Sequence, residues 1–201
     1  PASIDQGIVF RRTDLGVDIQ AKFDNVVDTR LCTVIANGQA KVGTVEHAVA
    51  ALVGAGIDNA IVEVDGPEVP ILDGSSAPFL FLLECAGIEE QFAPRAAIEV
   101  LRPVRVEDGK AYAELLPFPR GSRLDPPVLD MELTIDFAAP AIGQQGVALR
   151  LSHETFRDEL ARARTFAMAQ EVEQLRKMGL ALGGTLDNAV VVDGDRILNP
   201  A

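Results

Sequence analysis

The sequence is poor in the residues on which several protein classes depend. Its 201 residues include no tryptophan, one tyrosine, two cysteines and two histidines. Two cysteines are too few for a disulfide framework and indicate a reduced compartment, so we expect a cytoplasmic protein. The longest apolar run, at 79–88 (FLFLLECAGI), is short and contains Glu84, which argues against an integral membrane segment. The first residues, PASIDQG, also lack the basic start and apolar stretch of a signal peptide.

Positive charge is scarce as well. Eighteen Lys and Arg stand against 30 Asp and Glu, a net charge of −12, which argues against general affinity for nucleic acid. A local cluster such as Arg162, Arg164, Arg176 and Lys177 can still hold an anionic substrate, although a solvated helix face is the simpler role for the last two. The apolar share of 48%, with few aromatics, predicts a globular chain with an aliphatic core.

A Glu-His pair stands out near the start of a predicted helix at 45–53. One apolar stripe at helical spacing turns the pair away from the core; it consists of Val45, Ala48, Val49, Leu52 and Val53. Thr44 is the predicted N-cap, so Glu46 and His47 fall in the first turn, where the helix dipole favours a carboxylate and a neutral imidazole. Such a pair suits a metal ligand with an adjoining general base. The alternative is two solvated residues on an outer helix face.

Two segments of the chain resemble each other. Residues 57–66 read IDNAIVEVDG and residues 186–194 read LDNAVVVDG, and each follows an apolar helical stretch that ends in glycine. The repeat predicts an α+β fold of two related halves, each a small sheet packed on helices. We expect the first half to span 1–94 and the second 95–201.

Periodicity and turn residues predict the elements of both halves. Strands are expected at 7–11, 60–64, 97–106, 111–116, 131–137, 146–151 and 189–192, and helices at 45–55, 77–86, 154–162 and 169–178. Residues 107–110 (EDGK) predict a hairpin turn. Residues 117–127, with four prolines, predict a surface loop.

Few other side chains are candidate metal ligands. His153 lies at a helix start that Ser152 can cap, Cys32 alternates with apolar neighbours in a predicted strand, and Cys85 lies in an apolar helix and is expected in the core. The sequence contains no HExxH, CxxC or HxH motif. A catalytic zinc usually takes three protein ligands, so the residues supply one good ligand and too few others.

Residues 162–166 (RARTF) interrupt a helical pattern and set Thr165 between a basic and an aromatic residue. A hydroxyl there can donate a hydrogen bond to a developing oxyanion, while the alternative is a helix end with solvated arginines. Apolar residues follow, namely Val172, Leu175, Leu180, Ala181 and Leu182, and lead to Gly183-Gly184. Such a surface is normally core, and it can instead line a groove for an acyl chain.

Three segments together resemble one enzyme family: 44–79 (TVEHAVAALVGAGIDNAIVEVDGPEVPILDGSSAPF), 162–166 preceded by Ala161, and 179–193 (GLALGGTLDNAVVVD). The family is that of the UDP-3-O-acyl-N-acetylglucosamine deacetylases, zinc amidases of the committed step of lipid A synthesis, part of lipopolysaccharide formation in Gram-negative bacteria. The resemblance runs from residue 7 to residue 199. It implies a two-domain sandwich with duplicated βααβ halves.

The resemblance also implies roles for individual residues. His47 matches a zinc ligand, Glu46 the general base that activates water, and Thr165 the threonine that stabilises the oxyanion. The positions that match substrate-contacting ones are Leu31, Cys32 and Phe166 close to the site, and Val172, Ala181, Gly184 and Thr185 around the acyl passage. The implied reaction is hydrolysis of the 2-acetamido group of a UDP-linked, 3-O-acylated glucosamine, with release of acetate.

The sequence departs from the family pattern in its metal ligands. The family's later motif, His-Lys-x-x-Asp-x-x-Gly-Asp, its downstream histidine and its opening Gly-Leu-His strand do not occur here. We therefore expect a fragment whose remaining zinc ligands lie beyond Ala201 and which is nearly inactive alone. The alternative is a non-catalytic duplicated α+β module that binds a nucleotide sugar or a protein partner.

Overall fold

The computed structural model describes residues 2–119 and 128–200, which form two compact units. One unit comprises the described residues up to Gln91 and those from Asp130 onward, and the other comprises the described residues between Phe92 and Leu129. Small sheets and helices alternate along the chain, which confirms the predicted α+β class. The division into halves at residue 94 stays a prediction. No helix within the described ranges is long and apolar enough to cross a membrane.

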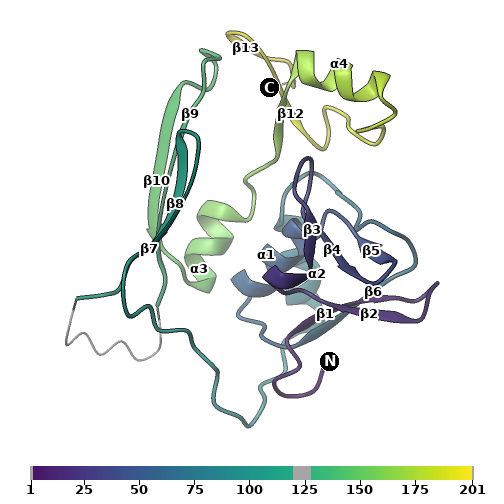
Figure 1. Ribbon diagram of the computed structural model, residues 1–201, viewed down its shortest axis with the longest axis vertical. Helices are drawn as coiled ribbons and strands as arrows, with labels where there is room; N and C mark the ends of the chain where they lie inside the picture. Colours follow the sequence, from purple (N-terminus) through teal and green to yellow (C-terminus); the bar gives the residue numbers. More distant parts are fainter. Residues whose placement is uncertain (1, 120–127, 201) are drawn as a thin grey trace. The chain divides into compact units, whose positions relative to one another are not determined.

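The first part of the larger unit contains two three-stranded sheets (Figure 1). Strand β1 (Ile8–Arg12) lies between β2 (Val17–Gln20), which is antiparallel to it, and β6 (Ala60–Val64), which is parallel. The second sheet is antiparallel, in the order β3 (Val26–Asp28), β4 (Val34–Asn37), β5 (Ala40–Val42), and a short 3-10 helix, Phe23–Asn25, precedes it.

Helix α1 (Glu46–Gly54) packs on these strands through one apolar core. Strand alternation turns every second side chain inward, so Phe10 of β1 meets Ile19 of β2 and both are completely buried. The buried members of this core are Phe10, Ile19, Ile35, Ala40, Val42, Val45, Ala48 and Val69. The core therefore fixes the helix that carries the Glu-His pair against both sheets.

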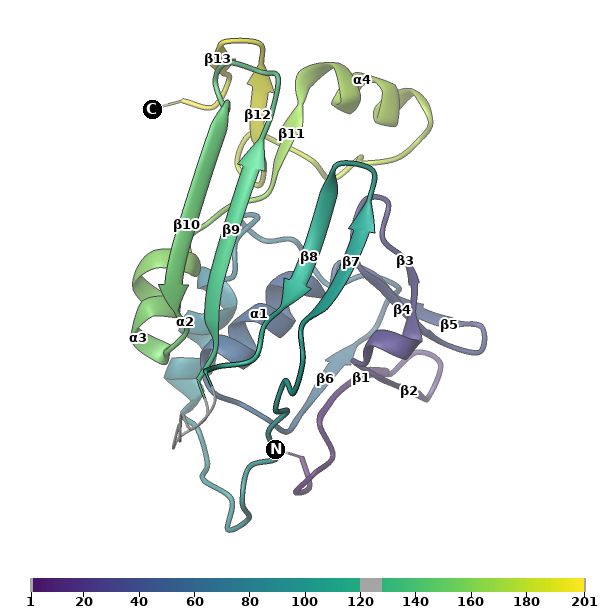
Figure 2. The same ribbon diagram turned by 60° about the vertical axis from the view of Figure 1, so that its left-hand side comes forward.

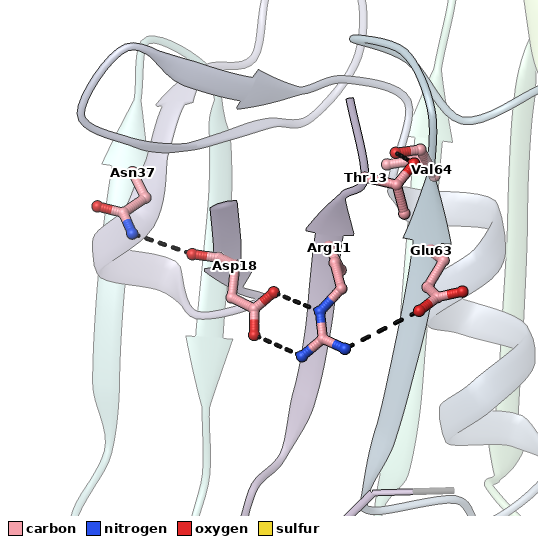
Figure 3. A network of polar contacts seen from close by, with 6 residues as sticks. All are labelled: Arg11, Thr13, Asp18, Asn37, Glu63 and Val64. Carbon is pink, nitrogen blue, oxygen red and sulfur yellow. Dashed lines mark hydrogen bonds and ion pairs between the residues drawn. The ribbon is translucent and has the colours of Figure 1, made fainter. Parts of the chain in front are cut away.

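On the other face of β1, Arg11 ties three strands together (Figure 3). Its Nε lies 2.7 Å from Asp18 on β2, and its Nη1 lies 3.9 Å from Glu63 on β6. The guanidinium hydrogen bond holds the pKa of Asp18 below its usual value. Asn37 on β4 donates to the backbone carbonyl of Asp18 at 2.9 Å, which links the two sheets.

The later part of the larger unit repeats the parallel pairing of β1 with β6. Strand β11 (Phe166–Met168) is parallel to β12 (Val190–Asp193), which pairs antiparallel with β13 (Arg196–Ile197), and α4 (Ala169–Lys177) connects β11 to β12 (Figure 2). Before them stands the antiparallel hairpin of β9 (Asp130–Asp136) and β10 (Gln144–Arg150). Both repeat strands, β6 and β12, thus pair in parallel with a strand that precedes them.

A second apolar core joins helices from the two parts of this unit. Helix α3 (His153–Thr155) continues into a π-helical turn, Phe156–Leu160, and packs on α1 and on α2 (Ala77–Ala86). The buried residues are Ala51, Ala55, Leu80, Phe156 and Ala161. Ser152 caps α3 as predicted, since its hydroxyl accepts the N–H of Thr155.

The smaller unit contains the hairpin of β7 (Val104–Asp108) and β8 (Ala111–Leu115). Gly109 takes φ +58° in the turn that residues 107–110 predict, and the guanidinium of Arg105 lies 3.7 Å from the ring centre of Tyr112 across the strands. The strand predicted from residue 97 begins only at Val104, directly after Pro103, which has no N–H to donate to a ladder. The loop expected at 117–127 lies, from Arg120 to Pro127, outside the described residues.

Several other predictions about the fold were wrong in detail. The helix expected at 154–162 is a short α-helical segment followed by the π-helical turn. Cys85, expected in the core, is exposed because α2 buries only Leu80. Cys32 is half-buried and lies in a bend before β4 rather than in a strand.

Candidate functional site

The Glu46-His47 pair begins helix α1, as the periodicity predicts. Both side chains are half-buried. Glu46 accepts a hydrogen bond on Oε2 from the backbone N–H of Thr33, at 3.1 Å. Within residues 2–119 and 128–200, the His47 ring has neither a hydrogen-bond nor an ion-pair partner. The pair therefore consists of a carboxylate held by a hydrogen bond and an imidazole whose ring nitrogens are available to a ligand.

The apolar stripe of α1 differs from the predicted one at its end. Val45, Ala48 and Leu52 are buried, but Val53 is 50% exposed and Ala51 takes the inward position. The reason is that Ala51 belongs to the second apolar core, where it packs with Leu80 and Phe156. The helical periodicity of α1 alone does not predict this contact. His47 remains outside both buried clusters.

Thr44 is not the N-cap of α1. Its backbone is left-handed, with φ +55°, and the N-cap position falls instead at Val45, whose side chain makes no capping hydrogen bond. The Thr44 hydroxyl instead donates to Oε1 of Glu68 at 2.6 Å. The helix start is thus fixed by a residue distant in sequence.

The segment at 31–33 lies next to this helix start. The Thr33 N–H reaches Glu46, and Sγ of Cys32 lies 3.5 Å from the point that a Cβ on Gly43 would occupy. Leu31 is 56% exposed. The structure therefore places Cys32 close to the start of α1, and a substrate contact by Leu31 or Cys32 stays a prediction.

Thr165 lies directly before β11, between two backbone hydrogen bonds. Its N–H donates to the carbonyl of Gly74 at 3.0 Å, and its carbonyl accepts the N–H of Val190 at 2.9 Å. Within the described part of the chain, its hydroxyl has no hydrogen-bond partner. The backbone of Thr165 is thus held while its hydroxyl stays available.

Arg164 clamps two loops, so the alternative of solvated arginines is wrong for this residue. Its Nε donates to the carbonyl of Asp73 at 2.9 Å, and its Nη2 donates to the carbonyls of Leu186, at 3.3 Å, and of Asp187. Arg176 is also engaged, because its Nη2 donates to the carbonyl of Gly184 at 2.9 Å. Of the four cations expected to hold an anion, Arg162 and Lys177 are exposed and free of such clamping bonds within the described ranges.

The two clamped loops approach each other closely at Gly74. A Cβ on Gly74 would lie 1.9 Å from the carbonyl oxygen of Asn188, and the φ of Gly74 is +79°. Buried Asn188 accepts the N–H of Thr185 at 2.8 Å and donates to the carbonyl of Gly183 at 2.9 Å. Thr165 and Thr185 therefore belong to one hydrogen-bonded loop cluster.

The remaining predicted substrate contacts lie around α4 and β11. Val172 is half-buried, Ala181 is exposed with φ +52°, and Phe166 is 39% exposed and meets Phe137 edge-on at 5.2 Å between ring centres. A hollow of about 180 Å³ beside α4 is lined by Ala139, Met168, Ala169, Gln170, Val192, Asp193 and Gly194, and by none of the predicted contacts. The acyl passage stays a prediction.

These contacts assemble two groups, one around Glu46 and His47 and one around Thr165 and Thr185. Within residues 2–119 and 128–200, no hydrogen bond or ion pair joins them. Nor do three or more His, Cys, Asp or Glu side chains converge there in a metal-binding group. A neutral imidazole and a carboxylate match zinc in kind, but one imidazole does not match the three protein ligands of a catalytic zinc in number.

Comparison with known proteins gives a direct answer about ancestry. A family model described as UDP-3-O-acyl N-acetylglycosamine deacetylase matches residues 1–201. The chain belongs to this deacetylase family. Three relatives are named UDP-3-O-acyl-N-acetylglucosamine deacetylase: those of Acidithiobacillus ferrooxidans, 51% identical over 203 residues, Idiomarina loihiensis, 52% over 204, and Shewanella sp., 49% over 205. The alignments cover 99–100% of this chain and 64% of each relative, so the chain spans 64% of their length.

Sequence reasoning missed several residues that hold the two candidate groups in place. The N–H of Thr33, the carboxylate of Glu68 and the clamp of Arg164 carry no local signature. The Asp-Asn-Ala triplet shared by the two repeats did carry one, because both asparagines bond to backbone. Asn59 accepts the N–H of Gly7 at 2.8 Å, as Asn188 accepts that of Thr185.

Proposed function

We propose that this chain carries the Glu-His centre of a zinc-dependent deacetylase. The enzyme would hydrolyse the N-acetyl group of UDP-3-O-acyl-N-acetylglucosamine, in lipid A biosynthesis. The observation that supports this most directly is the half-buried Glu46-His47 pair at the start of α1, in a chain that belongs to the deacetylase family. The name of the relatives supplies the substrate.

Glu46 is proposed as the general base. The Thr33 N–H fixes its Oε2, while within the described ranges its Oε1 accepts no hydrogen bond and is available to a water molecule. A carboxylate oriented in this way can take the proton of the water that attacks the acetamide carbonyl. The helix start contributes further, because the dipole of α1 stabilises a negative charge in the first turn.

His47 is proposed as one zinc ligand and Thr165 as a donor to the oxyanion. When bound, zinc supplies a Lewis acid that polarises the substrate carbonyl. The imidazole of His47 has a ring nitrogen to give because no described residue engages it. The hydroxyl of Thr165, on a backbone held at both its N–H and its carbonyl, can donate to the negative oxygen as it develops.

The substrate contacts are proposed on the same basis. Of the four cations in the predicted cluster, Arg162 and Lys177 are proposed to contact the diphosphate, because Arg164 and Arg176 donate to backbone carbonyls. The acyl and sugar contacts are proposed at Leu31, Cys32, Phe166, Val172, Ala181, Gly184 and Thr185.

A chimera tests the proposal, because a single imidazole is expected to bind zinc weakly in the 201 residues alone. The aligned part of this chain replaces the matching segment of the Acidithiobacillus ferrooxidans relative, and acetate release from the UDP-linked substrate is measured. Glu46→Gln keeps the hydrogen bond from Thr33 and is expected to lower kcat by about 10²- to 10⁴-fold with zinc content unchanged. His47→Ala is expected to lower zinc content itself.

Glu173→Gln on the exposed side of α4 is the matched control and is expected to leave both quantities unchanged. A zinc-loaded, folded chimera that deacetylates no substrate, or one in which Glu46→Gln is as active as the parent, would refute the proposal.

A further inference from the structure

We propose that Thr44 is a positioning residue. Its hydrogen bond to Glu68 holds its strained backbone, and that backbone fixes the positions of Glu46 and His47. What the pair does rests on the proposed function, whereas the positioning itself does not. Thr44 reaches neither substrate nor metal in this proposal and acts only through the first turn of α1.

The backbone of Thr44 is strained. Its φ of +55° lies in the left-handed region, which favours glycine, and its branched Cβ makes that region still less favourable. The residue is 4% exposed. A branched residue persists in this conformation only where its surroundings impose it, and such positions are concentrated at functional sites.

Three hydrogen bonds impose the conformation. The Thr44 hydroxyl donates to Oε1 of Glu68 at 2.6 Å. The other two bonds join the preceding residue, Gly43, to the two neighbours of Glu68. The N–H of Gly43 donates to the carbonyl of Pro67 at 2.9 Å, and the N–H of Val69 donates to the carbonyl of Gly43 at 3.0 Å. Residues 67–69 therefore form a short parallel rung beside Gly43, and Glu68 is the one side chain of that rung that grips Thr44.

The strained residue determines where α1 begins. Strand β5 ends at Val42 and α1 begins at Glu46, so the chain changes direction within the residues between them. Among the residues that the structure describes, no side chain caps the first turn. Glu46 follows Thr44 by two residues. The left-handed backbone at Thr44 therefore directs Glu46 toward the N–H of Thr33, the residue directly before β4.

Three variants of the chain separate the bond from the backbone conformation. Thr44→Ser keeps the hydroxyl. Thr44→Val keeps the branched shape without the hydroxyl, and Thr44→Gly loses the hydroxyl but takes positive φ without strain. The measured quantity is the amide hydrogen exchange of Thr33 by NMR, which reports the bond to Glu46 whether or not the protein is an active enzyme.

We expect Thr44→Val to speed exchange at Thr33 roughly tenfold or more, Thr44→Ser to leave it near the parent rate, and Thr44→Gly to retain most of the protection. Glu68→Ala is expected to match Thr44→Val while changing only an exposed side chain. Thr134→Val, on the exposed face of β9, is the matched control. The amide of Phe10 shows whether the core stays folded.

Unchanged Thr33 exchange in both Thr44→Val and Glu68→Ala would overturn the proposal. So would a Thr44→Gly variant that loses as much protection as Thr44→Val, because the bond would then not act through φ. In the active chimera we expect kcat to fall in Thr44→Val with KM little changed, and to recover in Thr44→Ser. An inactive chimera would refute the proposed function and leave the exchange result to decide the positioning role.

Discussion

Gly54 is the last residue of α1 and lies against the ring of Phe156. This contact predicts that Gly54→Ala lowers the stability of the protein, although alanine normally stabilises a helix relative to glycine. A Cβ on Gly54 would lie 2.1 Å from Cδ1 of Phe156 and 2.3 Å from its Cγ. Gly54 has a helical backbone, so Gly54→Ala would ordinarily stabilise the helix by about 0.5–1 kcal/mol. Here we expect it to destabilise the protein.

The magnitude follows from the packing. Two carbon atoms normally approach to about 3.5–4.0 Å, so the ring must move by roughly 1 Å or more to make room for the new Cβ. The ring packs among buried Ala51, Leu80 and Ala161, which resist such a movement. Overpacking a close-packed core costs about 1–3 kcal/mol, and a rigid ring overlapped near its root belongs at the upper end. Subtracting the helix gain leaves a net loss of about 2 kcal/mol in the free energy of unfolding.

A double-mutant cycle in urea, followed by circular dichroism, tests this value. Phe156→Ala alone is expected to cost about 3–5 kcal/mol. With the ring removed, the three atoms nearest to the added Cβ are gone, so Gly54→Ala is expected to stabilise by up to about 1 kcal/mol and the coupling energy is about 3 kcal/mol. Gly66→Ala, whose Cβ meets nothing within 4 Å, serves as the control. Equal effects of Gly54→Ala with and without the Phe156 ring would refute the reasoning.

The loops around Thr165 and the ion pair on the first sheet give three further expectations. Gly74→Ala places a Cβ 1.9 Å from the carbonyl oxygen of Asn188 at φ +79°, so we expect a loss of at least about 3 kcal/mol in urea unfolding, and a loss below 1 kcal/mol would contradict it. Arg164→Leu is expected to cost about 1–3 kcal/mol and Arg164→Lys to recover only part, because an ammonium cannot bridge carbonyls of two loops as a planar guanidinium does; an unchanged Tm in Arg164→Leu would exclude a clamp. The bond from Arg11 lowers the folded pKa of Asp18, so its stabilisation is present above the unfolded value of about 3.9 and is lost as the pH falls through the folded pKa. Asp18→Asn should therefore flatten the decline of stability below about pH 4, and an equally steep decline in the variant would count against this pair.

Elements with complete local signals could be predicted from the sequence. Strand β6 and helix α2 have the predicted bounds, since α2 begins with an Ala-Pro step and ends before Gly87, which takes φ +79°. Strands of three or four residues, such as β2 with its sequence VDIQ, were missed because so short a stretch contains little alternation.

The candidate site divides in the same way. The placement of Glu46 and His47 in the first turn of α1 depends on helical period and could be predicted. The grip on Thr44 could not, because it comes from Glu68, 24 residues away, and overrides the usual preference of threonine for capping. The partner of Glu46 is a backbone N–H, which every residue except proline possesses.

The parallel pairings imply an order in which the chain becomes structured. Phe166 and Val190, which pair across the connection through α4, are close in sequence, whereas Ile8 and Ala60 are farther apart. The approach of Gly74 to Asn188 closes a loop of more than one hundred residues. Contacts with long sequence separation form late in folding, because loop-closure entropy opposes them. Pulse-labelled hydrogen exchange should therefore protect the Val190 amide, which bonds to the Thr165 carbonyl, before the Thr165 amide, which bonds to Gly74, and the opposite order would count against this sequence of events. The loops that hold Thr165 would then be among the last of the described segments to fold and among the first to open.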